Sequence, residues 1–505
     1  MSGMRRVLLV LQRRLAWIPA PLRQRARALV GGRLEREAAV DGWSLPLVPS
    51  PDRRRLEWPD APPALTAAVA GAAESGAADG RPGVAGAETS TGSSARPPAP
   101  GLRCLLVTDS LDASGMDEFV AFLARRLRRH GIHTAVMIGS DDPDKGVGRL
   151  GRDLAAEGIE VADPGRAGAA AWMRAWRPDV LSVHGSADWA LEVAAELAIP
   201  AIETLHGMHN MFGAPLERVT RRRELLSALV SVSEMVRLQY LALDSGLDPR
   251  RIVTIPNGVD SRRVQTVPRQ QARDALGLTD EFVFVSLARH SLQKNGYALA
   301  SAFDEVAAAV PGTHLLICGR SDDRSYTGQV LALKQRLAHG DRLHLRDNTP
   351  HVAALLAAAD AFALDSFFEG WSLSSMEALG AGLPVVMSDV GGAREQLADG
   401  PAKGALVANP LGDPLAVDWA AIGGARFRDQ ANRAELIEAM TSLARGTLAV
   451  DERAVIAADS LARFDDELCI RRHAHAIGAT AERGPVQLPR DPVVAIDTDG
   501  GRHAG

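Results

Sequence analysis

Short apolar runs alternate along most of the chain with stretches in which apolar residues recur at helical spacing. The run from Leu102 to Thr108 has the continuous apolar character of a strand buried on both faces. An amphipathic stretch over 115–129 follows, and Gly131 can end it. This alternation predicts a doubly wound parallel sheet. Further strands are expected at 134–138, 179–183, 201–204, 228–232 and 252–255.

The same alternation then starts again, which predicts a second α/β unit. The boundary between the two units falls near 258–278, and the region 429–475 has a helical pattern. Two successive units of this size indicate two Rossmann-like domains, so the expected fold class is α/β. Strands of the second unit are expected at 282–287, 313–318, 342–345, 360–364, 384–387 and 404–407.

The first hundred residues have a different composition. Residues 1–36 contain nine arginines interleaved with apolar residues, and their first acid is Glu35. Such a segment, taken as 1–37, can contact an anionic membrane surface; a solvated tail or a helix packed on the catalytic body is the alternative. Residues 64–100 are rich in Ala, Gly, Ser, Thr and Pro, so 38–100 is expected to be a low-complexity linker.

Composition excludes several classes of protein. The net charge of −5 argues against a nucleic-acid-binding protein. The three cysteines are scattered and support neither a disulfide framework nor a CxxC metal site, which favours a reducing cytoplasm. No apolar run is long enough to span a bilayer. We therefore expect a cytoplasmic protein, peripheral on the inner face of the membrane if the basic segment binds there.

The segment 367–386, FFEGWSLSSMEALGAGLPVV, combines residues suited to a bound nucleotide. Glu369 and Gly370 follow a predicted strand, and a helix is expected from about Ser372. The free N–H groups at a helix start favour an anion such as a diphosphate. Glu377, within that helix, can accept hydrogen bonds from both ribose hydroxyls. The alternative is that these acids only complement the helix dipole.

Two cations follow the first strand of the second unit. Arg289 and Lys294 lie five residues apart in the loop ARHSLQKNG. Ligands of open parallel sheets bind at the carboxyl ends of the strands, where this loop is expected. An arginine and a lysine there can clamp a diphosphate, although a basic loop is often only a solvated surface.

These segments together resemble the family-four retaining glycosyltransferases of GT-B fold. The resemblance rests on ARHSLQKNG, on FEGWSLSSMEALGAGLPVV, on the SDVGGAREQL that follows and on the earlier IPNGVD, and it extends over about 102–475. It implies two Rossmann-like domains facing a cleft. It also implies an acceptor domain at 101–270, a donor domain at 271–455, a helix at 456–482 that packs back toward the first domain, and a flexible tail at 483–505.

The resemblance also implies roles for individual residues. Arg289 and Lys294 hold the nucleotide diphosphate, while Glu369 and Glu377 contact the donor sugar and the ribose. His184 faces the sugar from the first domain, and His206 is a further candidate. Catalytic residues are thus expected at His184, Arg289, Lys294 and Glu369, and donor contacts also at Gly115, Gly370, Trp371, Ser372, Leu373 and Glu377.

Some positions depart from the family pattern. The loop after the first strand has Ser114 and Asp117 where the family has a glycine and a glutamate. Asp365 stands where the family often has proline, and its carboxylate would repel a diphosphate unless it points away. The pair His206 and His209 lacks an evident third metal ligand, and the triplet at 497–499, DTD, lies in a polar tail. We expect neither a metal nor another cofactor.

The expected activity is transfer of a hexosyl group from a nucleotide diphosphate sugar to an acceptor hydroxyl, with retention at the anomeric carbon. Polysaccharide, glycolipid or glycoconjugate synthesis would use such a reaction, and the acceptor could be a glycan, a lipid-linked sugar or a small molecule. Three alternatives stay open: another GT-B enzyme such as a sugar-nucleotide epimerase, a pyridoxal-phosphate-dependent phosphorylase, and a nucleotide-sugar-binding protein without turnover.

Overall fold

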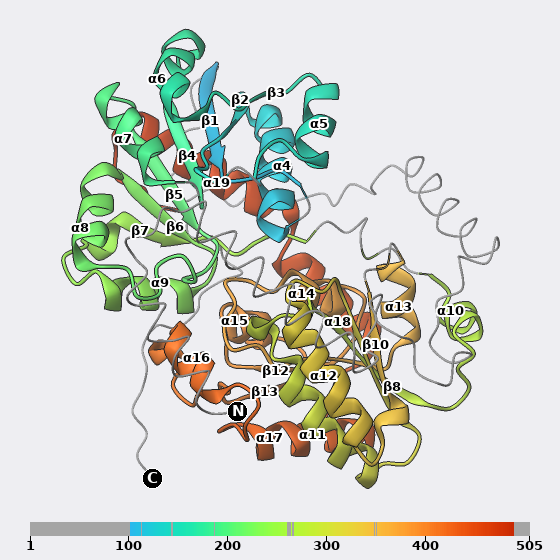
Figure 1. The fold of residues 1–505 in the computed structure, drawn as a ribbon. Helices are drawn as coiled ribbons and strands as arrows, with labels where there is room; N and C mark the ends of the chain where they lie inside the picture. The colour runs from blue at the N-terminus through green and yellow to red at the C-terminus, as the bar shows by residue number, and fades with distance from the viewer. Residues whose placement is uncertain are drawn as a thin grey trace.

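A computed structural model describes residues 101–488, except for 113, 143–144, 186, 260–263, 265–266, 348 and 350. The predicted basic segment 1–37, the linker 38–100 and the DTD triplet at 497–499 lie outside the described residues. The described chain forms two α/β domains, one above the other in Figure 1.

The upper domain is built on a seven-stranded sheet in the order β3-β2-β1-β4-β5-β6-β7. Every adjacent pair is parallel, as the strand–helix alternation predicted. The six predicted strands are present, and the short edge strand β3 was not predicted. The strands are β1 (Leu102–Thr108), β2 (Ile132–Ile138), β3 (Glu160–Ala162), β4 (Val180–His184), β5 (Ala201–Leu205), β6 (Ala228–Ser231) and β7 (Ile252–Thr254).

Helices cover both faces of this sheet, which explains why β1 is apolar without alternation: Cys104 to Val107 are completely buried. The predicted helix after β1 begins at the N-cap Ser114 and ends through a short 3-10 turn at Gly131, whose φ is 75°. The helices are α4 (Gly115–Arg126), α5 (Arg149–Ala156), α6 (Gly165–Trp176), α7 (Asp188–Glu196), α8 (Leu216–Leu225) and α9 (Glu234–Leu243).

The lower domain contains a six-stranded parallel sheet in the order β10-β9-β8-β11-β12-β13, and all its strands were predicted. These strands are β8 (Phe282–Leu287), β9 (Thr313–Cys318), β10 (Leu343–Arg346), β11 (Ala361–Leu364), β12 (Val385–Ser388) and β13 (Gly404–Val407). The helices are α10 (Arg269–Ala275), α11 (Gly296–Ala309), α12 (Arg324–Arg336), α13 (Val352–Ala358), α14 (Leu373–Gly380), α15 (Ala393–Leu397), α16 (Trp419–Ala425), α17 (Arg433–Ala444) and α18 (Arg453–Arg463).

The last helix, α19 (Asp466–Ala481), returns to the upper domain (Figure 1). Its residues Cys469, Ile470 and Ile477 belong to the apolar core that contains the inner residues of β1 and β2. Helix α18 instead packs against α14 of the lower domain. The chain therefore crosses between the domains a second time, between α18 and α19.

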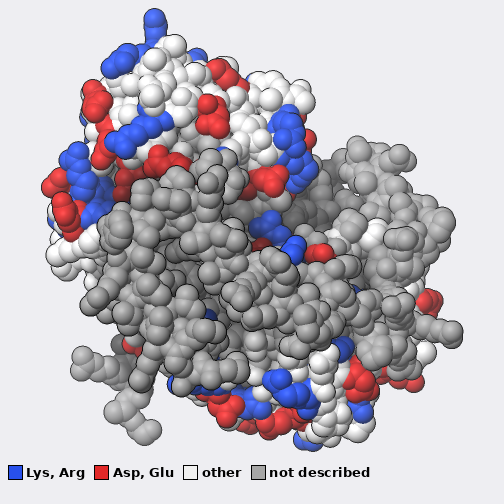
Figure 2. Space-filling view, viewed as in Figure 1, with Lys and Arg blue, Asp and Glu red and all other residues white. Residues whose placement is uncertain are grey.

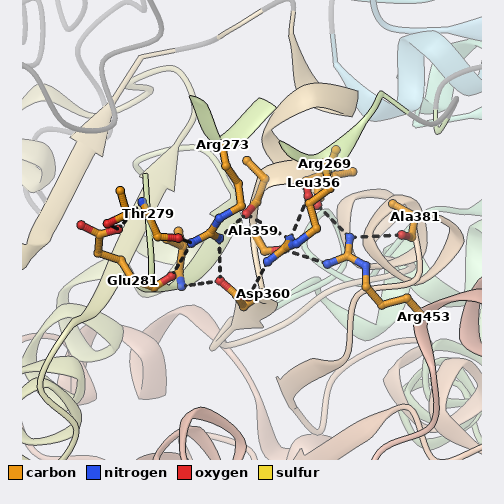
Figure 3. Close-up of polar contacts among 12 residues, drawn as sticks. Arg269, Arg273, Thr279, Glu281, Leu356, Ala359, Asp360, Ala381 and Arg453 are labelled. Carbon is orange, nitrogen blue, oxygen red and sulfur yellow. Dashed lines mark hydrogen bonds and ion pairs between the residues drawn. The ribbon is translucent and has the colours of Figure 1, made fainter. Parts of the chain in front are cut away.

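An arginine cluster fixes the start of β11 (Figure 3). The carboxylate of Asp360 accepts hydrogen bonds from Arg269 at 2.6 Å, Arg273 at 3.2 Å and the N–H of Val283 at 2.9 Å. Arg453 donates to the Ala359 carbonyl at 2.8 Å, and burial lowers its pKa to about 10. The amino end of β11 is thus tied to α10, β8 and α18, while its carboxyl end is left for the loop that carries Glu369.

The visible described surface carries basic and acidic side chains in mixture (Figure 2). Such interspersion matches the small net charge of −5. Within the described part of the chain, none of the helices has the length and apolar character needed to cross a membrane.

Candidate active site

A cavity of about 1160 Å³ lies between the two domains, at the carboxyl ends of the strands of both sheets. We call its lining residues from the upper domain the upper wall and those from the lower domain the lower wall. Arg289, Lys294 and Glu377 share this one cavity. All other predicted donor-binding residues line it too: Gly115, Glu369, Gly370, Trp371, Ser372 and Leu373.

Lys294 and Glu369 form an ion pair in the lower wall. The lysine Nζ lies 2.5 Å from Oε1 of Glu369, and their side chains are only 14% and 6% exposed. The same carboxylate oxygen accepts a hydrogen bond from the hydroxyl of Ser366 at 2.6 Å. The 3-10 turn η4 (Leu292–Lys294) after β8 thus holds its cation against the carboxylate that follows β11.

Arg289 is more exposed and is held differently. Its guanidinium forms an ion pair with Asp322 and donates to the side-chain oxygen of Gln293 at 3.1 Å. Asp322 also accepts from Arg320 at 2.8 Å, and Arg320 lines the cavity. Two guanidinium groups therefore share one carboxylate at the cavity edge, so the lower wall has positive charge that an anionic ligand can bind.

Helix α14 presents its first turn to the cavity. Ser372 is its N-cap and accepts a hydrogen bond from the Ser375 N–H at 3.2 Å. Glu377 is buried within the helix and lines the cavity as well. Trp371 lies mostly in the core, where its indole N–H donates to Met376 Sδ at 3.1 Å. The lower wall thus combines a helix start with an acid suited to hydroxyl groups.

Gly370 is the point where the two walls meet. A Cβ at this position would lie 1.9 Å from the carbonyl oxygen of His206 and 3.0 Å from the N–H nitrogen of Gly207. Both contacts are with backbone, so a side chain here would force the domains apart. The sequence predicted a donor contact at Gly370; in the structure Gly370 lines the cavity and also allows close approach of the other domain.

The upper wall is formed mainly by the loop after β1 and the start of α4. Ser114 accepts a hydrogen bond from the Asp117 N–H at 3.1 Å, and the Asp117 carboxylate accepts from the Ser114 N–H, also at 3.1 Å. The serine that departs from the family pattern is therefore a helix N-cap. Gly115 follows it, and a Cβ there would meet only Leu373 Cδ1, at 3.7 Å.

The two candidate histidines do not have equivalent positions. His206 lines the cavity, whereas His184 is completely buried behind it and does not. Nδ1 of His184 lies 2.9 Å from Nε2 of His206, and the hydroxyl of Ser182 lies 3.0 Å from the other nitrogen of His184. The structure therefore brings His206, rather than His184, to the surface that a ligand would contact.

These histidines are held in the neutral form. Burial lowers the pKa of His206 to about 3 and lowers the pKa of His184 well below its usual value. His473 of α19 packs behind them on the ring of Phe119, and burial lowers its pKa to about 3 as well. A neutral imidazole can accept or donate a hydrogen bond without adding charge to the upper wall.

Asp365 points away from the cavity, which removes the repulsion expected from its carboxylate. It is buried, and it accepts hydrogen bonds from the side-chain amides of Asn295 at 2.9 Å and Asn432 at 2.7 Å. Burial raises its pKa to about 7. Asn295 directly follows Lys294 and has a φ of 52°. Asp365 therefore anchors the loop that carries the lysine.

Several cavity residues were not singled out from the sequence. Asn257 belongs to the IPNGVD motif, and its side-chain oxygen is buried without a hydrogen-bond partner. Trp419 reaches from α16 to the upper domain, where its indole N–H donates to the His209 carbonyl at 3.3 Å. Asn257 lies within a quoted motif but was given no role there, and Trp419 lies in a helix far from the motifs, so periodicity gave no signal for either side chain. Charged residues among the others are Asp109, Asp112, Glu118, Lys145, Arg152 and Arg320.

His209 also lines the cavity, and burial lowers its pKa. Over the described residues, no group of three or more His, Cys, Asp or Glu side chains is arranged to hold a metal ion, and the pair His206 and His209 has no third ligand there.

Comparison with known proteins agrees with this geometry. Residues 113–263 match the family described as Glycosyltransferase Family 4, and residues 268–418 match Glycosyl transferases group 1. D-inositol 3-phosphate glycosyltransferase of Segniliparus rotundus is 27% identical over 244 residues, which are 45% of this chain and 54% of that protein. Glycogen synthase of Mycobacterium tuberculosis is 29% identical over 244 residues, 45% of this chain and 56% of that protein. The chain thus spans little more than half the length of these relatives.

Solved structures share the fold. Anabaena HepE in complex with UDP and glucose superposes with a TM-score of 0.57 at 18% identity, covering 75% of this chain and all of that one. The apo lipopolysaccharide outer core galactosyltransferase WaaB gives 0.53 at 15% identity, covering 73% of this chain and 97% of that one. At these identities the likeness concerns the fold: two Rossmann-like domains with a cavity between them.

Proposed function

The chain belongs to the family-four glycosyltransferases of GT-B fold, and we propose that it transfers a hexosyl group from a nucleotide diphosphate sugar to an acceptor hydroxyl with retention of anomeric configuration. The observation that carries this proposal is the lower wall, where Arg289, Lys294, Glu369 and Glu377 line one cavity. Support for a nucleotide sugar also comes from HepE, which binds UDP and glucose in the same fold.

In this proposal the diphosphate binds against Arg289 and Lys294 and the first turn of α14. Glu377 accepts hydrogen bonds from the ribose hydroxyls, and Glu369 orients the sugar ring. When the anomeric C–O bond to the diphosphate breaks, the negative charge that grows on the leaving oxygen is stabilised by fixed cations and N–H groups. These groups would replace a divalent metal, so we propose a metal-independent reaction.

The acceptor hydroxyl attacks from the upper wall. A new C–O bond forms on the face that the diphosphate leaves, and the acceptor proton passes to a departing diphosphate oxygen. His206, neutral and at the wall, is the upper-domain group we assign to the sugar, and His184 positions it through the 2.9 Å contact. Closure of the domains at Gly370 would exclude water from this reaction.

A two-stage experiment tests the proposal. Thermal shift with UDP, GDP, ADP and TDP sugars identifies the donor, because a ligand that binds the folded state raises its stability. Product analysis by NMR then reports the anomeric configuration and whether EDTA changes the rate. Glu377→Ala should weaken nucleotide binding in calorimetry, and unchanged affinity would remove its role. Donor binding without transfer to any acceptor would overturn the enzymatic assignment in favour of a binding protein.

A further inference from the structure

A smaller cavity of about 350 Å³ adjoins the main one at His206, Gly207 and His209. We call it the side cavity. Its described lining comes from the upper domain: the carboxyl ends of β1, β2, β4 and β5, the loop after β5, and the helices α4 and α8. Its volume is at the small end of the range for ligand cavities, about 300–1000 Å³. In the reaction proposed above, a molecule here would lie beside the sugar-facing histidine, where the acceptor must be.

The cations of the side cavity are already neutralised. Arg222 is buried and donates to Glu203 at 2.5 Å, and it also forms an ion pair with Asp188. Arg218 donates to the same Asp188 at 2.6 Å. Two guanidinium groups are thus matched by two carboxylates before any ligand arrives. A phosphate group would have to break these pairs to gain a cationic partner, and it would leave a buried carboxylate unpaired.

Among the described residues that line the side cavity, acids outnumber arginines and lysines. Asp141 and Asp142 are exposed in the loop after β2, and Asp109 lines both cavities, paired with Lys145. Oε2 of the buried Glu203 has no hydrogen-bond partner. His206 adds no positive charge, because burial lowers its pKa to about 3. The side cavity therefore offers a ligand carboxylate oxygens and a negative field.

We propose that the acceptor is an uncharged sugar or polyol, and that the side cavity selects it against phosphorylated or otherwise anionic acceptors. Carboxylates accept hydrogen bonds from hydroxyl groups, so the exposed Asp141 and Asp142 suit the hydroxyl-rich face of such a molecule, while Glu203 stays buried and paired with Arg222. The same carboxylates repel an acceptor phosphate. The inference rests on the proposed glycosyl transfer, because it assigns the second substrate of that reaction.

Arg152 is the cation that a phosphorylated acceptor could use instead of the side cavity. It is exposed on α5 and lines the main cavity but not the side cavity. Among the described basic residues that line either cavity from the upper domain, it is the one without an ion pair. A phosphorylated acceptor that bound productively would have to reach it, so Arg152→Ala distinguishes the two acceptor classes.

The test compares each neutral acceptor with its own phosphate ester, for example glucose with glucose 6-phosphate and myo-inositol with myo-inositol 1-phosphate, at saturating donor. Release of the nucleoside diphosphate measures turnover, and calorimetry on the enzyme–UDP complex measures acceptor binding. We expect kcat/KM at least tenfold higher for the neutral member. The double variant Asp141→Lys/Asp142→Lys should decrease the ratio of kcat/KM for the neutral acceptor to kcat/KM for its phosphate ester at least tenfold. The control Glu160→Lys/Glu196→Lys makes the same charge change elsewhere on the upper domain and should leave the ratio unchanged.

Equal or better use of the phosphate esters, with turnover lost in Arg152→Ala, overturns the inference while leaving glycosyl transfer intact. Failure of the neutral compounds both to react and to bind also overturns it, as does an unchanged ratio in the double variant. Failure of the donor itself to bind is a different result, because it overturns the proposed function and appears in the thermal-shift panel before any acceptor is added.

Discussion

The two walls of the main cavity are built from the same kind of loop at the end of parallel strands, yet their lining residues differ in charge. The described lower wall has three cations, Arg289, Lys294 and Arg320, and two acids, whereas the upper wall has four acids and two cations. The acids of the upper wall are Asp109, Asp112, Asp117 and Glu118. A nucleotide diphosphate suits the first wall and an uncharged hydroxyl compound suits the second. In the proposed reaction, charge rather than fold would assign the two substrates to the two domains.

The largest expected difference in kcat is between alanine variants of two lysines, one in each wall, that are each paired with an acid. Lys294→Ala in the lower wall should reduce kcat about 100-fold, because the leaving diphosphate loses a fixed cation. Lys145→Ala in the upper wall removes an exposed ion pair with Asp109 and should change kcat only a few-fold. Steady-state kinetics with the identified donor measures both. Similar losses in the two variants would contradict the division of roles between the walls.

A second pair of variants compares one glycine from each wall. Gly370→Ala places a Cβ against the His206 carbonyl and should hold the domains apart, with turnover at least tenfold lower. Gly115→Ala meets only Leu373 Cδ1, at ordinary contact distance, so the domains should still close, and a loss of turnover there would report the predicted donor contact instead of closure. Small-angle scattering with and without UDP would show whether Gly370→Ala has lost a compact, closed state. A normal closed state in that variant would exclude the proposed contact.

The histidines behind the upper wall should make stability depend on pH. The pKa of His184, His206 and His473 is lowered in the folded protein, so between pH 6.5 and about 3 the unfolded chain binds more protons. Stability is therefore full above pH 6.5 and falls as pH decreases, by at most about 1.4 kcal/mol per pH unit for each histidine.

Thermal unfolding between pH 7 and pH 5 checks this dependence. His473→Leu should give a shallower fall in Tm than the unmodified chain, since it removes one of the three groups. His133→Leu, at an exposed position of β2, should leave the slope unchanged. Equal slopes in all three proteins would show that His473 does not contribute to the pH dependence of stability.

The smallest changes, in UDP affinity and in the free energy of unfolding, are expected for Asp365→Asn behind the lower wall. The residue lies outside the donor cavity, so UDP affinity should stay within about twofold. Asn432 can rotate its amide to present its unpartnered Oδ1 to the new NH₂ group, which limits the loss of stability to about 1 kcal/mol. Calorimetry and denaturant unfolding measure the two quantities. Markedly tighter UDP binding would mean that the carboxylate does act on the donor.

The amino-acid sequence by itself determined the two-domain parallel architecture, because strands buried on both faces must be continuous apolar runs that alternate with helices. It also determined the lower wall, since Arg289, Lys294, Glu369 and Glu377 follow strands whose carboxyl ends meet at one edge. The edge strand β3 escaped prediction because three partly exposed residues carry no periodic signal.

Only the tertiary structure decided the upper wall and the contact between domains. His184 and His206 both follow strands, and a pattern along the chain cannot tell which imidazole faces the cavity and which lies behind it. The direction of Asp365 depends on Asn295 and Asn432, which come from distant segments. The fit of Gly370 against His206 depends on how two domains close, and the neutralisation of Arg218 and Arg222 depends on carboxylates from other elements. Such features arise from distances in space, which local sequence does not encode.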